Sequence, residues 1–187
     1  MKPNELWNDY FPNGELRKTP RPVALGNPDC EEDSIVGTVL ILFYRKNPAT
    51  NSFEVLFQKR SPLVDHNAGK WDYSAGGHIN FNESPLAAAL RETKEEIGVS
   101  LAESELEFLA TLKASFKKNM FLNCYLSDRT GKPDVFNFND EEVSEVKWVP
   151  FSEFDNFIDE FCKSSIKNGK LTRKIFKKWL KSKNGTD

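Results

Sequence analysis

Acidic residues crowd together in one short segment of this chain, between residues 91 and 96. Glu92 and Glu96 are four residues apart, and Glu92 and Glu95 are three apart, so a helix through this segment places the three carboxylates on one face. Like charges at this spacing repel each other. Oxygen donors that converge on one patch suit a hard divalent cation such as Mg²⁺ or Mn²⁺, which also binds substrate phosphates. The segment therefore predicts a metal site.

The residues that flank the acidic segment are typical of a helix with defined ends. Ser84 is a good N-cap, and Pro85 suits the first helical position. Gly98 follows the apolar Ile97 and is typical of a helix end. We therefore predict a helix over residues 85–97. The sequence Ala-Gly-Gly that ends at Gly77 leads the chain toward this helix.

The spacing of these residues resembles the Nudix box. Gaps of five, seven, two and one residues separate the box residues Gly77, Glu83, Arg91-Glu92, Glu95-Glu96 and Gly98. An apolar residue, Val99, follows as the pattern requires. Thr93 departs from the pattern, because a larger aliphatic residue is usual there, although its methyl group can still pack.

The resemblance implies the roles of the box residues. The implied metal ligands are Glu92 and Glu96 as the core pair, Glu95 as a direct or water-mediated ligand, and the Gly77 carbonyl as a candidate backbone ligand. Arg91 and Glu83 would orient these ligands without binding the metal themselves, since a guanidinium holds carboxylates in a fixed fork geometry. The alternative is a solvated helix face on which Arg91 and Lys94 pair with the acids.

Hydrolysis of a phosphoanhydride also needs a group that orients and deprotonates the attacking water. In many members of the family this acid comes from a loop late in the fold. Glu141 and Glu142 are the candidates here, with Glu142 favoured because it lies nearer the strand predicted at residues 146–151. Glu95 is the competing base, and either loop acid can instead be a plain surface residue.

Three basic residues are candidates for contact with a diphosphate. Lys59 and Arg60 end a predicted strand, and Lys70 precedes Trp71. Each can equally be an ordinary surface charge.

The sequence before the acidic helix is similar to the branch of the family close to isopentenyl-diphosphate isomerase. That isomerase protonates carbon with a Cys two residues before the His that corresponds to His78, where this chain has Gly76. Glycine has no side chain to ionise, and the box is complete, so hydrolysis of a diphosphate linkage in a nucleoside diphosphate joined to another group is favoured. The isomerase and a catalytically silent Nudix binding domain are the alternatives.

Composition limits the number of domains, the kinds of partner and the compartment that we expect. A chain of 187 residues with 39% hydrophobic and 29% charged residues is typical of one soluble domain, predicted over residues 1–187. A net charge of −2 argues against a nucleic-acid coat protein. The resemblance implies a small-molecule diphosphate as the partner, and a homodimer is left open. Three unpaired Cys residues indicate a reducing compartment, and no apolar run approaches a membrane span, so we expect a cytoplasmic protein.

The pattern of apolar runs predicts an α/β protein. Turn residues around Asn13-Gly14 indicate an N-terminal hairpin over about residues 5–28. The predicted strands cover residues 35–44, 53–60, 71–74, 106–116, 120–127 and 146–151, and helices are predicted at residues 152–162 and 171–181. The resemblance implies the Nudix α/β/α sandwich with a mixed β-sheet over about residues 35–162. The apolar spacing of Leu171, Ile175 and Trp179 predicts the C-terminal helix, at about 170–182. Nine basic residues between 163 and 183, with no acid among them, indicate a solvated helix face in preference to an RNA-binding one.

Overall fold

The sheet of this protein is organised around its longest strand, β2 (Ile35–Lys46). A computed structural model describes residues 7–11, 13–16, 35–115, 119–138, 141–162 and 170–184. In this part of the chain the strands form one mixed sheet with the order β4-β3-β2-β7-β6, in which β7 runs parallel to β2. The other strands are β1 (Asp9–Tyr10), β3 (Phe53–Arg60), β4 (Trp71–Tyr73), β5 (Ala75–His78), β6 (Glu107–Ser115), β7 (Asn119–Asp128) and β8 (Val143–Pro150).

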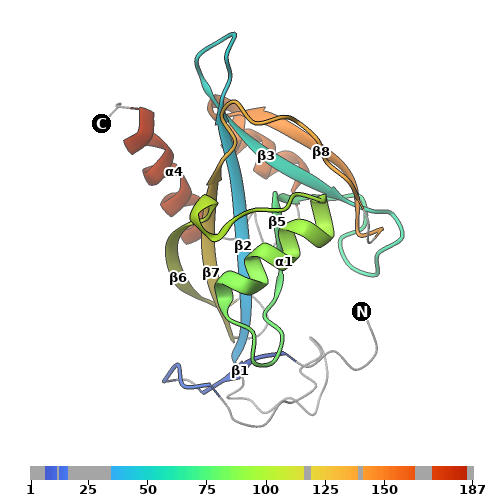
Figure 1. Ribbon diagram of the computed structural model, residues 1–187, viewed down its shortest axis with the longest axis vertical. Helices are drawn as coiled ribbons and strands as arrows, with labels where there is room; N and C mark the ends of the chain where they lie inside the picture. Colours follow the sequence, from blue (N-terminus) through green and yellow to red (C-terminus); the bar gives the residue numbers. More distant parts are fainter. Residues whose placement is uncertain are drawn as a thin grey trace.

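Helices cover both faces of this sheet. The described helices are α1 (Pro85–Ile97), α2 (Phe154–Phe161) and α4 (Lys170–Asn184), with short 3₁₀ helices η1 (Glu103–Glu105) and η2 (Phe151–Glu153). Figure 1 shows α1 in front of β2 and β5, and α4 on the other side of the sheet near β6. None of the described helices combines the length and the apolar character needed to span a bilayer.

The buried side chains form a separate core on each face. The core under α1 includes Ile41, Phe43, Leu56, Ile79, Ala88 and Ile97. The core on the opposite face includes Phe57, Phe154, Phe157, Phe176 and Leu180. Because both faces are covered, β2 reads as an almost continuous apolar run. The predicted α/β/α sandwich with a mixed sheet is confirmed.

The sheet divides where β2 and β3 separate, and the chain from β4 to β5 fills the gap. β4 pairs with β3, whereas β5 pairs with β2. Ser74 stands between the two strands and is fully buried. Its Oγ accepts a hydrogen bond from the Phe43 amide at 2.8 Å and donates one to the Leu56 carbonyl at 2.7 Å. Ser74 thus links β2 and β3 across the gap, and the chain continues into β5, where Gly76 and Gly77 lie beneath α1.

Three predicted boundaries need correction. The strand predicted at 71–74 ends at Tyr73, and a separate strand, β5, follows Ser74. β8 begins at Val143 instead of residue 146. The chain after β8 first forms η2, so α2 begins at Phe154 instead of residue 152. The predicted N-terminal hairpin is represented by β1 and a bridge between Tyr10 and Leu16, and residues 17–34 lie outside the described residues. The division into a single domain over 1–187 stays a prediction.

Candidate metal centre

The helix that carries the acidic residues is fixed at both ends. Ser84 Oγ accepts the Ala87 amide at 3.1 Å, as predicted for the N-cap. Gly98 ends the helix with φ 71°, and a Cβ at this position would lie 2.5 Å from the Asn137 carbonyl oxygen. Only glycine meets both conditions, the left-handed backbone and the close neighbour. Thr93 is buried, and its hydroxyl donates to the Ala89 carbonyl at 2.7 Å, so the departure from the box pattern is accommodated within the helix.

Glu96 lies in the interior with its carboxylate against the sheet. Its side chain is buried, and Oε2 accepts hydrogen bonds from Gln58 Nε2 at 3.0 Å and from the Gly76 amide at 2.8 Å. Both donors are neutral. Burial raises the pKa of Glu96 well above its usual range, and the charges of Glu92 and Asp72 raise it further. A full negative charge at this position therefore calls for a cation.

Glu92 lies against the backbone of β5. A Cβ built on Gly77 would stand 2.3 Å from Glu92 Oε1, so only a glycine allows the strand and the carboxylate to approach this closely. Burial raises the pKa of Glu92 to about 7, even though Arg91 opposes the shift. The charges of Glu95 and Glu142 contribute in the same direction as burial.

Arg91 connects the acids of the box to one another. Nε and Nη2 bind the two oxygens of Glu83 at 2.9 Å each, and Nη1 binds Glu92 Oε1 at 2.7 Å and Glu95 Oε2 at 3.1 Å. Nη2 also donates to the His78 carbonyl at 2.9 Å. Glu83 in turn accepts the Asn80 amide at 2.9 Å. Arg91 thereby ties the helix to the loop that precedes it, which is the arrangement expected for a positioning residue.

The two loop acids differ in their relation to this cluster. Glu142 lies directly before β8, its carboxylate is 4.0 Å from Arg60 Nη2, and its charge acts on Glu92. Its carbonyl accepts the Ser61 amide at 2.8 Å, which ties this part of the loop to the end of β3. Glu141 is exposed and has a positive φ of 59°. The structure brings Glu142 and Arg60 toward the helix acids.

Comparison with known proteins agrees with this arrangement. Residues 36–167 match the NUDIX domain family. The chain belongs to this family. It is 36% identical over 116 residues to "Nudix hydrolase 3" of Arabidopsis thaliana, a match that covers 57% of this chain and 15% of that protein. It is 26% identical over 109 residues to an isopentenyl-diphosphate Delta-isomerase of Ruegeria pomeroyi, covering 56% of this chain and 60% of that protein. The chain thus spans less than two thirds of these curated relatives.

Solved structures share the fold of this Nudix domain. DR0079 from Deinococcus radiodurans superimposes with a TM-score of 0.70 at 18% identity, covering 92% of this chain and 99% of that one. An Ap4A hydrolase binary complex from C. elegans gives a TM-score of 0.58 at 24% identity, covering 79% of this chain and 99% of that one. At these identities the likeness concerns the fold.

The three basic candidates of the Nudix domain fall on different surfaces. Lys59 Nζ lies 3.3 Å from Glu145 and 5.8 Å from the centre of the Trp71 ring, which belongs to the core on the face opposite α1. The structure therefore does not bring Lys59 to the carboxylates. Lys70 is exposed at the end of the loop that follows β3. Arg60 Nε donates to the His66 carbonyl at 3.0 Å, so Arg60 also anchors that loop.

Two buried polar residues near Glu96 were not predicted from the sequence. Gln58 and Asp72 are register partners across β3 and β4 and are both buried. Gln58 bonds Glu96, and the charge of Asp72 acts on Glu96. The alternation of side chains along a strand could have identified Gln58. It stands two residues after Leu56, on the strand face where an apolar residue is expected.

The donor set of this Nudix domain fits a divalent cation. Carboxylate and carbonyl oxygens are the ligands that Mg²⁺ and Mn²⁺ prefer. Gln58 Oε1, buried beside this cluster, has no hydrogen-bond partner among the described residues. Within the same residues, no three His, Cys, Asp or Glu side chains already stand in the geometry of a metal site. Arg91 binds Glu92 and Glu95, and Glu96 accepts from Gln58 and Gly76, so these oxygens have protein partners.

Proposed function

We propose that this Nudix domain is a metal-dependent hydrolase that cleaves a diphosphate linkage in a nucleoside diphosphate joined to another group. The observation that carries the proposal is the burial of Glu92 and Glu96 against Gly76 and Gly77, with the pKa of both carboxyls raised. Folding alone does not favour two neighbouring buried carboxylates. A divalent cation, which Nudix enzymes generally use, would stabilise both in their charged form.

Each box residue has a role in this proposal. Glu92 and Glu96 would hold Mg²⁺ or Mn²⁺, with Glu95 and the Gly77 carbonyl as further donors. The cation would offset the charge that develops on the phosphoryl oxygens. Arg91 and Glu83 position the ligands and do not contact substrate.

Glu142 is the base we favour. Its carboxylate acts on Glu92, and its backbone is tied to Ser61, so it is held near the ligands by β8 and the end of β3. Glu141, which is exposed like Glu142, is a weaker candidate because it lies one residue further from β8, and Glu95 is the competing base within the helix. Arg60 is the basic residue best placed to contact the diphosphate, because it lies next to Glu142.

Among the described residues, no cysteine stands at the position that the isomerase uses for its proton donor. At Gly76 the backbone amide, not a side chain, faces Glu96. The two described cysteines, Cys124 and Cys162, belong to the core on the face opposite α1. Burial also raises the pKa of Cys124 to about 12. The relative named isopentenyl-diphosphate Delta-isomerase nevertheless makes the isomerase assay a necessary comparison.

The proposal is tested with a substrate panel in Mg²⁺: nucleoside di- and triphosphates, sugar nucleotides, ADP-ribose and dinucleotides. Wild-type protein should release a phosphorylated product from at least one, and Glu96→Gln should lower kcat at least about a hundredfold, because it removes an anionic ligand without changing shape. Near-normal turnover in this variant contradicts the metal-site assignment. Isomerisation without hydrolysis favours the isomerase, and a protein inactive in both assays is a binding domain.

A further inference from the structure

Trp7 and Asn8 lie outside the matched region 36–167, yet they contact the loop that leads into the acidic helix α1. β1 pairs with the start of β2, and Trp7 bridges Asn80. Asn8 lies between these two contacts. Its amide donates to the Ile79 carbonyl at 2.9 Å, and its carbonyl accepts the Gly37 amide at 3.1 Å. The segment is therefore hydrogen-bonded both to the sheet and to the loop.

The side chain of Asn8 binds the loop at two points. Nδ2 donates to the Glu83 carbonyl at 3.0 Å, and Oδ1 accepts the Asn82 amide at 3.2 Å. Asn8 is 2% exposed, so water does not readily replace these bonds. Asn82 has a positive φ of 64°, a conformation that needs support from its surroundings. The two bonds fix the turn at whose end Glu83 stands.

Trp7 supports the backbone contact of Arg91, which is made to His78. Its ring stacks on the His78 ring with centroids 3.6 Å apart and planes 4° apart. The carbonyl of His78 accepts a hydrogen bond from Arg91 Nη2. Both backbone segments that Arg91 depends on, at His78 and at Glu83, are thus held by residues 7 and 8.

We propose that Asn8 is a positioning residue of the metal centre, acting through Glu83 and Arg91 on Glu92 and Glu95. The inference rests on the proposed function for its activity readout. It extends the functional unit beyond residues 36–167. Loss of the Asn8 side chain frees the turn at Asn82 and Glu83, and the fork between Glu83 and Arg91 no longer holds the carboxylates in one geometry.

The test compares Asn8→Ala with Asn47→Ala. Asn47 is a matched control, because its side chain also fixes a turn, accepting the Ala49 and Thr50 amides and donating to Glu54, at a place remote from α1. Asn8→Ala should lose more stability in urea denaturation than Asn47→Ala, because Asn8 is buried and the turn bonds of Asn47 are exposed, so activity and metal binding are compared at the same folded fraction. Only Asn8→Ala should lower kcat, by about tenfold or more with KM within a few-fold, and only Asn8→Ala should weaken Mn²⁺ binding, measured by electron paramagnetic resonance.

Equal kcat and equal Mn²⁺ affinity in the two variants, compared at the same folded fraction, overturn the inference. If wild-type protein hydrolyses none of the panel, the proposed function fails separately. Mn²⁺ affinity then decides the role of Asn8, and an affinity that is the same in wild type and Asn8→Ala contradicts it.

Discussion

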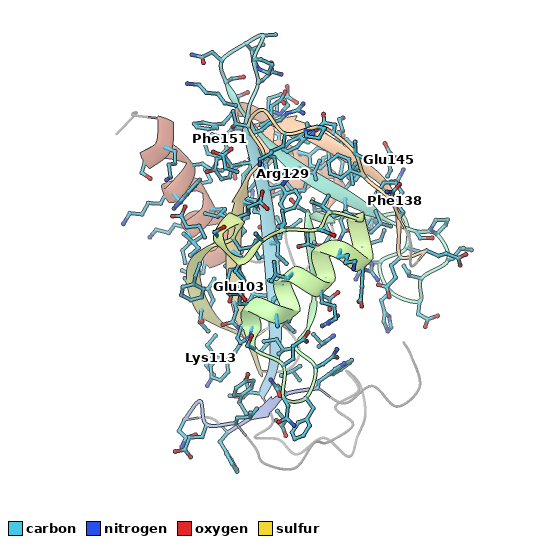
Figure 2. The ribbon with its side chains drawn as sticks, in the orientation of Figure 1. Glu103, Lys113, Arg129, Phe138, Glu145 and Phe151 are labelled. Atoms are coloured by element: carbon cyan, nitrogen blue, oxygen red, sulfur yellow. The ribbon has the colours of Figure 1, made fainter. Side chains whose placement is uncertain are left out.

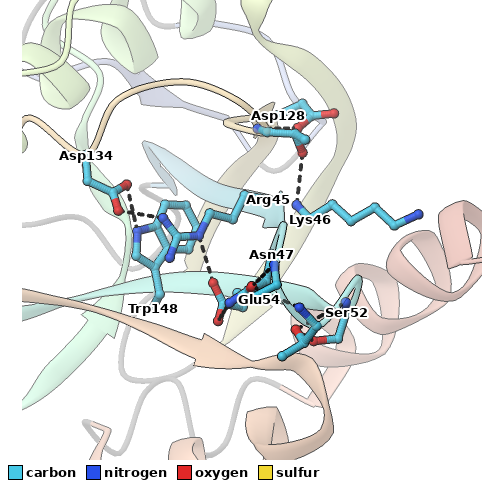
Figure 3. A network of polar contacts seen from close by, with 11 residues as sticks. Arg45, Lys46, Asn47, Ser52, Glu54, Asp128, Asp134 and Trp148 are labelled. Carbon is cyan, nitrogen blue, oxygen red and sulfur yellow. Dashed lines mark hydrogen bonds and ion pairs between the residues drawn. The ribbon is translucent and has the colours of Figure 1, made fainter.

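Two arginine-centred networks in this protein have similar components and different charge balance. Arg45 of β2 binds Glu54 through Nε at 2.7 Å, pairs with Asp134, and lies 4.2 Å from the centre of the Trp148 ring. Trp148 Nε1 donates to Asp134 at 3.0 Å, as Figure 3 shows. Every charged group there has an opposite charge or a ring beside it.

The Arg91 network has more negative charge than one guanidinium can balance. Arg91 forms ion pairs with Glu83, Glu92 and Glu95, while the neighbouring Glu96 is buried among neutral donors. The pKa of Glu92 rises to about 7 despite its bond to Arg91. In the Arg45 network one guanidinium also faces two carboxylates, but the Asp134 side chain is 47% exposed, so its charge is solvated. The contrast teaches that an excess of carboxylates over arginine points to a cation site where the carboxylates are buried.

The loop at residues 129–138 joins the two regions. It carries Asp134 to Arg45, and the Asn137 amide donates to the Ile97 carbonyl at 3.1 Å. Phe138, labelled in Figure 2, therefore lies at the end of α1 nearest the acidic residues. The loop is thus a covalent and hydrogen-bonded link between the Arg45 network and α1.

The largest expected difference between the networks is in the pH dependence of stability. With metal removed by chelation, the free energy of unfolding should fall by about 3 kcal/mol as pH rises from 5 to 8. Glu92 keeps its proton in the folded state up to about pH 7 but loses it near its model-peptide value of 4.5 when unfolded, so its stabilising effect is lost across this window. Glu96 acts in the same direction. Urea denaturation in chelator at several pH values measures the effect.

Glu92→Gln should flatten this pH profile, whereas Asp134→Asn should leave its slope unchanged. Asp155 and Glu105, whose pKa values are lowered, act with the opposite sign but below about pH 4.5. A wild-type stability that rises steadily from pH 5 to 8 would show that the helix acids do not carry excess charge.

A second difference should appear when each arginine is replaced by lysine. Arg91→Lys should lower kcat about a hundredfold, because one ammonium cannot hold Glu83 in a fork and reach the His78 carbonyl and the ligands together. Arg45→Lys, the control, should change kcat less than about twofold. Steady-state kinetics on the best panel substrate compares them, and a similar loss in both variants would erase the distinction between the networks.

The smallest expected effect concerns Glu142. Glu142→Gln should lower kcat about tenfold and remove the lower-pH limb of the rate profile, while Mg²⁺ affinity changes little, since the proposed base and the proposed ligands are separate residues. Glu141→Gln is the neighbouring control and should retain activity. If both loop variants behave like wild type and Glu95→Gln loses activity, the base lies in the helix.

Local sequence patterns predicted the helix that carries the site. Ser84 and Gly98 cap α1 as expected, because capping depends on residues within one turn. The fixed spacing of the box also predicted that the carboxylates share one face. Local patterns could not predict which strands and loops, far apart in the sequence, pair with each other. The orientation of Lys59, the contact of Gln58 with Glu96 and the anchoring of Glu83 by Asn8 all depend on which strands and loops meet.

The most direct test of the metal centre is a calorimetric titration of Mg²⁺ into chelator-treated protein at pH 7.5. Wild type should bind Mg²⁺ saturably and release protons, because the carboxyl of Glu92 is partly protonated near this pH. Glu96→Gln should lose most of this binding, and Asp134→Asn should retain it. Equal binding by wild type and Glu96→Gln would contradict the assignment of the buried carboxylates as metal ligands.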